Sequence, residues 1–134
     1  MRLRSWIIPL VAAAAAISAS NTFGSGAARV TSSLDGKTVL PQRSRWLVHP
    51  GIPVSSVREV DYLIDGKLSW VERSSPYYFG GDDNGADPGY LITTWIGAGR
   101  HVFTSRVVGI DGKATTDVVT ARVRAAAPPP TTLA

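Results

Sequence analysis

The sequence predicts an all-β fold, an antiparallel β-sandwich of about seven strands in a single domain. Between the two ends of the chain no segment has helical periodicity, whereas short runs of β-branched and aromatic residues recur. Glycine, proline and Asp-Gly turn signals separate these runs. The segment that holds them, residues 34–124, is close to the roughly 100 residues that one such sandwich needs.

The first 20 residues have the pattern of a signal peptide rather than of a folded element. Arg2 and Arg4 precede an apolar run over residues 6–17, and cleavage is expected after Ser18 or Ala19. The apolar run is shorter than the roughly 20 residues of a membrane-spanning helix. We therefore expect a secreted, extracellular protein that is not held in a membrane once the signal is removed.

Charge and cysteine content narrow the function classes. Removal of residues 1–20 deletes two arginines and no acid, so the formal charge falls from +4 to +2. The remaining chain has no cluster of Lys and Arg with interleaved aromatics, which argues against a nucleic-acid partner. The chain has no cysteine, so packing alone must stabilise the exported domain.

Two segments of biased composition flank the domain. Residues 21–33 are mostly small and polar and include two glycines, which is typical of a flexible lead-in. Residues 125–134 collect alanine, a triple proline and threonine, the composition of an extended tail or linker. We therefore assign residues 34–124 to the folded domain.

Eight segments of the domain have strand character, and turns separate them. The expected strands are residues 38–40, 45–48, 57–64, 68–72, 77–79, 90–95, 100–109 and 114–124. The main turns are a Pro-Gly turn at 50–53, Asp-Gly turns at 65–66 and 111–112, a long polar loop at 80–89 and a Gly-Ala-Gly turn at 97–99.

The hairpin bent at Asp65 has two possible registers. A loop of two residues sets Glu59 opposite Glu72, and directly opposed like charges are destabilising. A loop of three residues, with Gly66 as the left-handed bulge residue, avoids this clash. The pairs then expected are Val60 with Trp70, Tyr62 with Leu68, and Arg58 with Glu72.

The same bulged register, applied to the second hairpin, pairs Phe103 with Val119 and His101 with Ala121, which keeps apolar groups on one face. The expected core consists of the large apolar side chains on the inward parity of their strands. These are Trp46, Val60, Tyr62, Trp70, Phe103, Val107 and Val119.

Three strings, VDYLIDGKLSW, SSPYYFGG and GRHVFTSRVVGIDGKATTDVVTARV, follow one another in the domain. Their strand and turn elements stand at Val60, Tyr62, Asp65, Gly66, Pro76, Tyr77, Gly99, His101 and Asp111. In this order they resemble bacterial immunoglobulin-like domains of secreted proteins, a type often joined to extracellular glycoside hydrolases and adhesins. The resemblance covers most of residues 34–124 and implies an immunoglobulin-like sandwich without common catalytic residues. The loop at 80–89 departs from the family pattern.

No arrangement of residues predicts a catalytic site. The sequence has no cysteine nucleophile, no nucleophile-elbow motif, no phosphate-binding loop and no paired histidines at metal-ligand spacing. His101 alternates with Phe103 and Ser105, which predicts a packed residue at the rim of the core. Glu59 and Glu72 are two carboxylates, but a glycosidase pair needs a cleft. We expect no enzymatic activity.

The loop at 80–89 holds the densest group of oxygen ligands. Asp82, Asp83, Asn84 and Asp87 lie among glycines, and calcium takes six to eight oxygens on such a backbone. Their spacing differs from the EF-hand pattern, so we interpret them as solvated turn residues and expect no cofactor. A calcium site at these four residues is the alternative.

Aromatic side chains are the remaining candidates for binding, because sugars stack on exposed flat rings. Tyr77 and Tyr78 face opposite ways in a strand, so one of them must look outward. Tyr78 and Tyr90 are the better candidates for a carbohydrate-binding site. The sequence thus predicts a non-catalytic secreted module that serves as a spacer, stabiliser or protein-interaction domain, with a carbohydrate-binding module as the alternative. The expected partner is an extracellular protein or a polysaccharide, in an oligomeric state that the sequence leaves open.

Overall fold

The described part of the chain folds into two layers of β-strands. The computed structural model describes residues 29–81, 89–125, 128 and 130–131, so the predicted signal peptide lies outside it. No helix in these residues has the length and apolar character needed to cross a membrane. The elements are β1 (Thr31–Ser32), β2 (Val39–Leu40), β3 (Arg43–Ser44), β4 (Leu47–His49), the 3-10 helix η1 (Val54–Ser56), β5 (Val57–Ile64), β6 (Lys67–Glu72), β7 (Tyr77–Tyr78), β8 (Leu91–Ile92), the 3-10 helix η2 (Thr93–Trp95), β9 (Gly99–Gly109) and β10 (Ala114–Val123).

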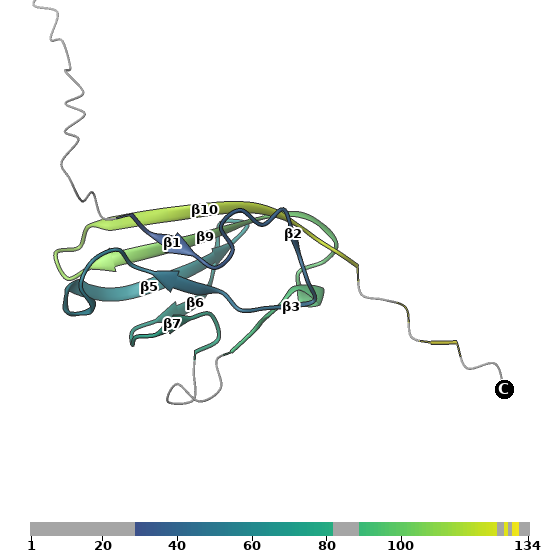
Figure 1. Ribbon diagram of the computed structural model, residues 1–134, viewed down its shortest axis with the longest axis horizontal. Helices are drawn as coiled ribbons and strands as arrows, with labels where there is room; N and C mark the ends of the chain where they lie inside the picture. The colour runs from purple at the N-terminus through teal and green to yellow at the C-terminus, as the bar shows by residue number, and fades with distance from the viewer. Residues whose placement is uncertain (1–28, 82–88, 126–127, 129, 132–134) are drawn as a thin grey trace, which may run out of the picture.

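The larger layer is a five-stranded sheet in the order β2-β10-β9-β5-β6. The facing layer consists of a three-stranded sheet, β1-β4-β7, and the pair β3-β8. The long strands β9 and β10 run side by side along the molecule (Figure 1). The strand pairs of the described residues are antiparallel except β2 with β10, which is parallel. The predicted all-β sandwich is confirmed, with one parallel pair at its edge.

The interior is centred on Trp46, which is fully buried. Its ring meets Tyr62 and Phe103 edge-on, with centroids 4.9 and 5.6 Å away, and stacks on Phe79 at 5.7 Å. The indole Nε1–H donates to Ser105 Oγ at 3.0 Å, so this buried donor is satisfied. The predicted core residues found buried are Trp46, Val60, Tyr62, Phe103, Val107 and Val119.

The second hairpin has the predicted register. Phe103 lies opposite Val119 and His101 opposite Ala121, without a shift along the ladder. Phe103, Ser105 and Val107 of β9 are buried at alternate positions, as a strand with one interior face requires.

The first hairpin departs from the predicted register at its turn. Asp65 and Gly66 both have positive φ, 51° and 77°, which is the backbone of a two-residue turn that twists with its strands. This turn sets Leu63 opposite Leu68. The predicted three-residue loop is therefore wrong, and so are the pairs Val60 with Trp70, Tyr62 with Leu68, and Arg58 with Glu72.

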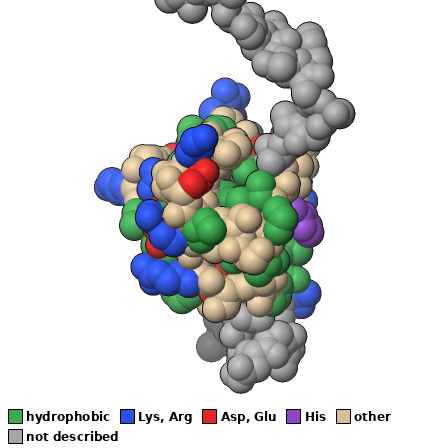
Figure 2. Space-filling view, turned by 90° about the vertical axis from the view of Figure 1, so that its left-hand side faces the viewer, with side chains coloured by type: hydrophobic (Ala, Val, Ile, Leu, Met, Phe, Trp, Pro, Cys, Tyr) green, Lys and Arg blue, Asp and Glu red, His purple; other side chains and the backbone are tan. Residues whose placement is uncertain are grey.

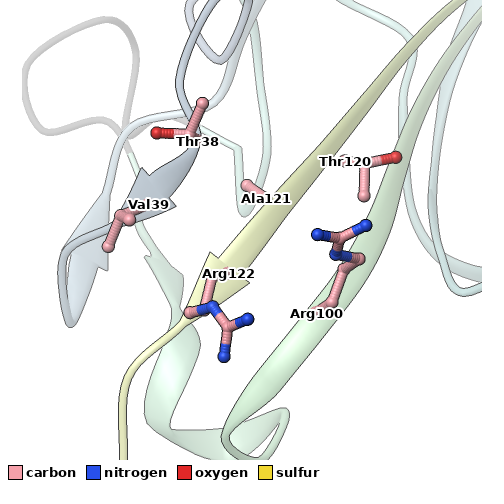
Figure 3. A pocket seen from close by; sticks show the side chains of 6 residues that line it. All are labelled: Thr38, Val39, Arg100, Thr120, Ala121 and Arg122. Carbon is pink, nitrogen blue, oxygen red and sulfur yellow. The ribbon is translucent and has the colours of Figure 1, made fainter.

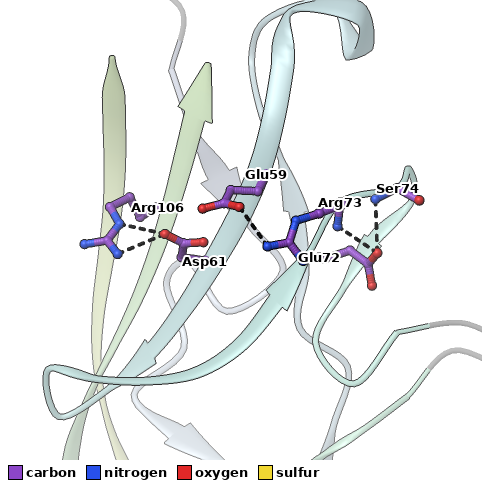
Figure 4. Close-up of polar contacts among 6 residues, drawn as sticks. All are labelled: Glu59, Asp61, Glu72, Arg73, Ser74 and Arg106. Atoms are coloured by element: carbon purple, nitrogen blue, oxygen red, sulfur yellow. Dashed lines mark hydrogen bonds and ion pairs between the residues drawn. The ribbon is translucent and has the colours of Figure 1, made fainter. Parts of the chain in front are cut away.

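A β-bulge removes the clash that argued against the shorter turn. Ser69 is an extra residue in β6, so Tyr62 lies opposite Trp70 beyond the bulge. Glu59 then meets a cation, since Arg73 Nη2 lies 3.4 Å from Glu59 Oε2 (Figure 4). The opposite charges that the sequence predicts at the rim are present, but with other partners.

Trp70 is not a core residue, contrary to the prediction. It is 38% exposed, because β6 is an edge strand of the five-stranded sheet. Its ring packs against Phe79 with centroids 6.3 Å apart, and its Nε1–H donates to Glu72 Oε2 at 3.4 Å. Trp70 therefore covers the margin of the interior rather than filling it.

Two segment boundaries also need correction. Val30 is buried and β1 pairs with β4, so the sandwich begins within the predicted lead-in at 21–33. The predicted strand at 90–95 is a strand only over β8, and η2 follows it. Thr93 causes this change, since its N–H and its hydroxyl donate to the carbonyl oxygens of Gln42 and Pro41.

The two ends of the described domain lie at opposite ends of the molecule (Figure 1). The chain enters beside the turn after β4, where a Cβ on Gly51 would lie 2.6 Å from the carbonyl oxygen of Arg29. It leaves where Val123 of β10 pairs with Gly99. Figure 2 looks onto the entry end and shows Lys and Arg side chains gathered along one side. The ten residues of β10 span about 33 Å between these ends.

His101 ties the turn of the first hairpin to β9. Its Nδ1 lies 2.6 Å from Asp65 Oδ2, and its Nε2 lies 2.9 Å from the carbonyl oxygen of Gly97. Asp65 Oδ1 also accepts a hydrogen bond from Val102 N–H at 2.9 Å. The hydrogen bond between the two side chains raises the pKa of His101 and lowers the pKa of Asp65. His101 is the packed rim residue that the sequence predicts, with a carboxylate partner that the sequence did not reveal.

The stability contributed by His101 should depend on pH. A histidine whose pKa rises on folding stabilises fully below its unfolded value, about 6.5, and loses this contribution as the pH rises through the raised value. The lowered pKa of Asp65 has the opposite effect, with its contribution lost as the pH falls below about 4.

Thermal unfolding should therefore show that the native protein is more stable than a His101→Gln variant at about pH 6, and that this difference decreases as the pH rises above about 6.5. The decrease should be at most about 1 kcal/mol, because the Asp65 side chain is 45% exposed. A difference that stays constant as the pH rises would contradict a charged imidazole in the folded protein.

Candidate interaction surface

The outer face of the five-stranded sheet carries a row of side chains that crosses four strands. The register places Leu68 beside Leu63, Leu63 beside Thr104, and Thr104 beside Val118. Leu68 and Val118 are more than half exposed, and Val102 is exposed on the same face of β9. We call Leu63, Leu68, Val102, Thr104 and Val118 the apolar row. Exposed apolar side chains that gather in this way are typical of surfaces that bind other proteins.

Charged pairs occupy one end of this face. Arg106 Nε–H and Nη2–H both donate to Asp61 Oδ2, at 3.0 and 2.9 Å, beside the ion pair of Arg73 with Glu59 (Figure 4). Asp61 is buried, so losing Arg106 would leave an uncompensated charge in the fold. The pair of Asp61 with Arg106 is therefore part of the fold, whereas the Arg73 side chain is 71% exposed.

The other end of the face holds two arginines without an acidic partner. Arg122 of β10 lies directly opposite Arg100 of β9, and in the described residues neither makes an ion pair. Opposed like charges in a sheet are destabilising. The pair lines a hollow of about 350 Å³ between β2, β9 and β10 (Figure 3). The other lining residues are Thr38, Val39, Thr120 and Ala121.

A second hollow, of about 390 Å³, lies next along β10 and shares Thr38 and Thr120 with the first. Asp117 lines it, and its buried Oδ2 has no hydrogen-bond partner among the described residues. Burial, and then the neighbouring carboxyl of Asp35, raise the pKa of Asp117 to about 6. Asp35 itself accepts a hydrogen bond from Ser32 N–H at 2.9 Å. The two carboxyls thus lie where the turn after β1 meets β10.

Tyr90, predicted to bind carbohydrate, is covered by arginines. The guanidinium carbons of Arg43 and Arg45 lie 4.4 and 5.4 Å from its ring centroid, within the range of cation–π attraction. Arg45 Nη2–H also donates to Tyr90 Oη at 3.2 Å. The cause is the β3-β8 register, in which Ser44 faces Leu91, so that Arg45 and Tyr90 come next along the chain. A sugar would have to displace these guanidinium groups.

Tyr78 belongs to a different part of the layer. It lies in β7 opposite Leu47, and it is half-buried while Tyr77 is buried, as the predicted alternation requires. Tyr62 Oη donates to the carbonyl oxygen of Tyr77 and so fixes this strand against the larger sheet. Tyr78 and Tyr90 therefore stand on separate sheets, β1-β4-β7 and the neighbourhood of β3-β8.

Trp95 is the most exposed large ring of the described residues, at 84%, and the sequence did not single it out. An unbroken strand at 90–95 would place Trp95 on the same face as Leu91 and Thr93, which are buried. η2 interrupts this alternation and turns the indole outward. The Gly-Ala-Gly turn at 97–99 indicates that the strand ends before residue 97, but it does not indicate that the strand already ends at Ile92.

The carboxylates considered as a glycosidase pair lie on opposite faces of the sheet. Glu72 lies opposite the buried Val60, whereas Glu59 precedes Val60 in the strand and faces the other way. Glu72 Oε1 accepts hydrogen bonds from the N–H groups of Arg73 and Ser74, at 3.0 and 3.1 Å (Figure 4). Glu59 and Glu72 cannot act together on one substrate.

The loop residues considered as calcium ligands, Asp82, Asp83, Asn84 and Asp87, lie outside the described residues. Within residues 29–81 and 89–125, no three His, Asp or Glu side chains are grouped as metal ligands would be. The interpretation of these four as solvated turn residues stays a prediction, with a calcium site as the alternative.

No protein-family model and no curated protein matches the chain. Among solved structures, the chain is similar to the fibronectin(III)-like modules of Clostridium thermocellum CbhA, with 16% sequence identity and a TM-score of 0.54. The similarity covers 74% of this chain and 100% of that chain. At this identity it shows the fold alone, and fibronectin type III domains share the sandwich architecture of immunoglobulin domains. The immunoglobulin-like β-sandwich that the sequence predicts is thereby confirmed.

Proposed function

We propose that this protein is a non-catalytic module that acts outside the cell as a rigid spacer and protein-interaction domain. The observation that carries the proposal is the placement of the chain ends, which lie at opposite ends of the sandwich (Figure 1). Whatever precedes residue 29 and follows residue 124 is held apart by about the length of β10, roughly 33 Å.

The interior supports a rigid rather than an adaptable spacer. Trp46 contacts aromatic rings from both layers, and its N–H is bonded to Ser105 in the middle of β9. A close-packed interior of this kind transmits force and resists compression. The absence of cysteine makes the domain independent of the redox state outside the cell, where the signal-peptide pattern directs it.

The outer face of the larger sheet supports the interaction role. The apolar row is exposed to solvent and lies on the same face as Arg100 and Arg122. The centres of protein interfaces are rich in apolar side chains and arginine. The two carboxylates considered as a glycosidase pair, Glu59 and Glu72, lie on opposite faces of the sheet, and Glu59 pairs with Arg73. These features favour a binding module over an enzyme.

Energy transfer between two dyes tests the spacer role. Because the chain has no native cysteine, an Arg29→Cys/Arg124→Cys double variant can be labelled at these two sites alone. We expect a single narrow distribution of transfer efficiency, centred on a separation of about 30 to 40 Å. In denaturant it should broaden towards larger separations, since an unfolded chain is much more extended. A broad distribution in native buffer would contradict a rigid spacer.

A carbohydrate-binding module is the second candidate, and Trp95 favours it. Its indole is 84% exposed at the end of η2, and flat exposed indoles stack on sugar rings. However, Trp95 has no second ring beside it among the described residues, and Tyr90 is covered by Arg43. A platform of several coplanar rings is therefore lacking there.

Retention on insoluble cellulose, chitin and xylan separates the two candidates. We expect the native protein to stay in the supernatant, as a Trp95→Ala variant should. Retention of the native protein that is lost in Trp95→Ala or Tyr78→Ala, but kept in Trp95→Phe, would replace the protein-interaction role with carbohydrate binding.

A further inference from the structure

The hydrogen-bonding edge of β10 is open along most of its length. β2 pairs with β10 only at Arg122 and Val123, and Arg122 N–H donates to the carbonyl oxygen of Thr38 at 2.8 Å. Alternate residues of a strand direct their N–H and C=O groups to the same side, so those of Val118 and Thr120 also point to this edge. In residues 29–81 and 89–125 no backbone group pairs with them on this side.

The two hollows described above run along this open edge. They meet at Thr38 and Thr120, so together they form one groove beside β10, which we call the β10 groove. A groove bordered by unpaired strand groups is the geometry in which an extended peptide adds to a sheet.

The charge of the β10 groove favours an anion at the end that Arg100 and Arg122 line, because no carboxylate of the described residues lines that hollow. The two arginines come from neighbouring positions of β9 and β10 (Figure 3). In the other hollow Arg29 and Lys37 stand together with the carboxyls of Asp35 and Asp117, so the anion-binding end of the groove is the arginine pair. A carboxylate between Arg100 and Arg122 would remove their mutual repulsion and accept charge-assisted hydrogen bonds from both.

Apolar side chains beside the arginines favour a peptide over an acidic polysaccharide. Val39 is 40% exposed in the first hollow, and Val118, exposed on the apolar row, lines the second. A peptide strand offers amide groups to the open edge and side chains that alternate between carboxylate and apolar. A uronic acid polymer offers the carboxylates without the amides.

We propose that the β10 groove binds an extended acidic peptide segment of a partner protein. The peptide backbone pairs with the N–H and C=O groups of Val118 and Thr120, and one of its carboxylates is held by Arg100 and Arg122. This partner class deepens the interaction role proposed above and rests on it.

Titration of the ¹⁵N-labelled protein with short capped peptides tests the proposal. The probe is a peptide of alternating Glu and Val, and its control replaces every Glu by Gln. We expect the amide signals of Val118, Thr120 and Arg122 to shift saturably with the Glu peptide. The Gln peptide should bind at least about tenfold more weakly, because hydrogen bonds to charged groups are the stronger ones.

Variants of the arginines separate binding from stability. Arg100→Gln and Arg122→Gln should each weaken the Glu peptide at least about tenfold. They should raise the melting temperature slightly, since each removes an opposed like charge. Arg58→Gln removes the same charge at the start of β5, near the other end of the sheet, and should leave the affinity unchanged.

Three results would overturn the proposal. One is the absence of saturable shifts at millimolar Glu peptide, and another is equal binding of the Gln peptide. The third is that polygalacturonate shifts the same signals more strongly than the peptide, which would assign the groove to polysaccharides. The spacer role is judged separately by energy transfer, so either idea can fail without the other.

Discussion

The two layers of this domain depend on the indole of Trp46. The residue stands between β3 and β4 in the smaller layer, and its N–H reaches Ser105 in the middle of β9. Its ring faces Tyr62 of β5 and Phe103 of β9 edge-on and stacks on Phe79 beyond β7. Because the chain has no cysteine, no disulfide joins the layers. The packing of this ring and its hydrogen bond connect them instead. Loss of a buried ring of this size costs about 3 to 5 kcal/mol, a large part of the stability of a domain this small.

The surface follows from the same arrangement. Since Val60, Tyr62 and Phe103 are buried in the same core cluster as Trp46, the residues between them along β5 and β9 face the other side of the sheet. The two ends of that outer face differ in how their charges are paired. Asp61 and Arg106 neutralise each other at one end, whereas Arg100 and Arg122 repel each other at the opposite end. A domain that keeps such a pair beside an open strand edge gains stability when an anion fills the space.

Strand alternation made most of the fold predictable. β5, β9 and β10 lie where apolar and polar residues alternate, and the second hairpin has the register that keeps Phe103 opposite Val119. The predicted register of the first hairpin was wrong because it assumed a ladder without bulges. In such a ladder the two-residue turn would place Glu59 directly opposite Glu72. A bulge at Ser69 avoids this contact while keeping the two-residue turn, and nothing local in the sequence marks a bulge. Trp70 was placed in the core because the sequence does not show that β6 is an edge strand.

The candidate site was less predictable, because it depends on contacts between remote segments. The predicted register of the second hairpin already implies that Arg100 faces Arg122, yet the hollow beside them needs β2, which comes from residues 39–40. Tyr90 was predicted to be an exposed ring because Arg43 and Arg45, which cover it, lie in and directly after β3, at least 45 residues away in the sequence. Trp95 is exposed because Thr93 bonds to the segment at 41–42 and ends the strand early.

Hydrogen exchange of the individual indole N–H groups tests the role of Trp46 most directly. Trp46 Nε1–H should exchange only through global unfolding, at the rate of the best-protected amides of β9, because it is buried and bonded to Ser105. The indole N–H of Trp95 should exchange at nearly the rate of a free indole, and that of Trp70 should exchange well before global unfolding. Exchange of Trp46 as fast as Trp95, while the amides of β9 stay protected, would show that the two layers do not depend on this ring.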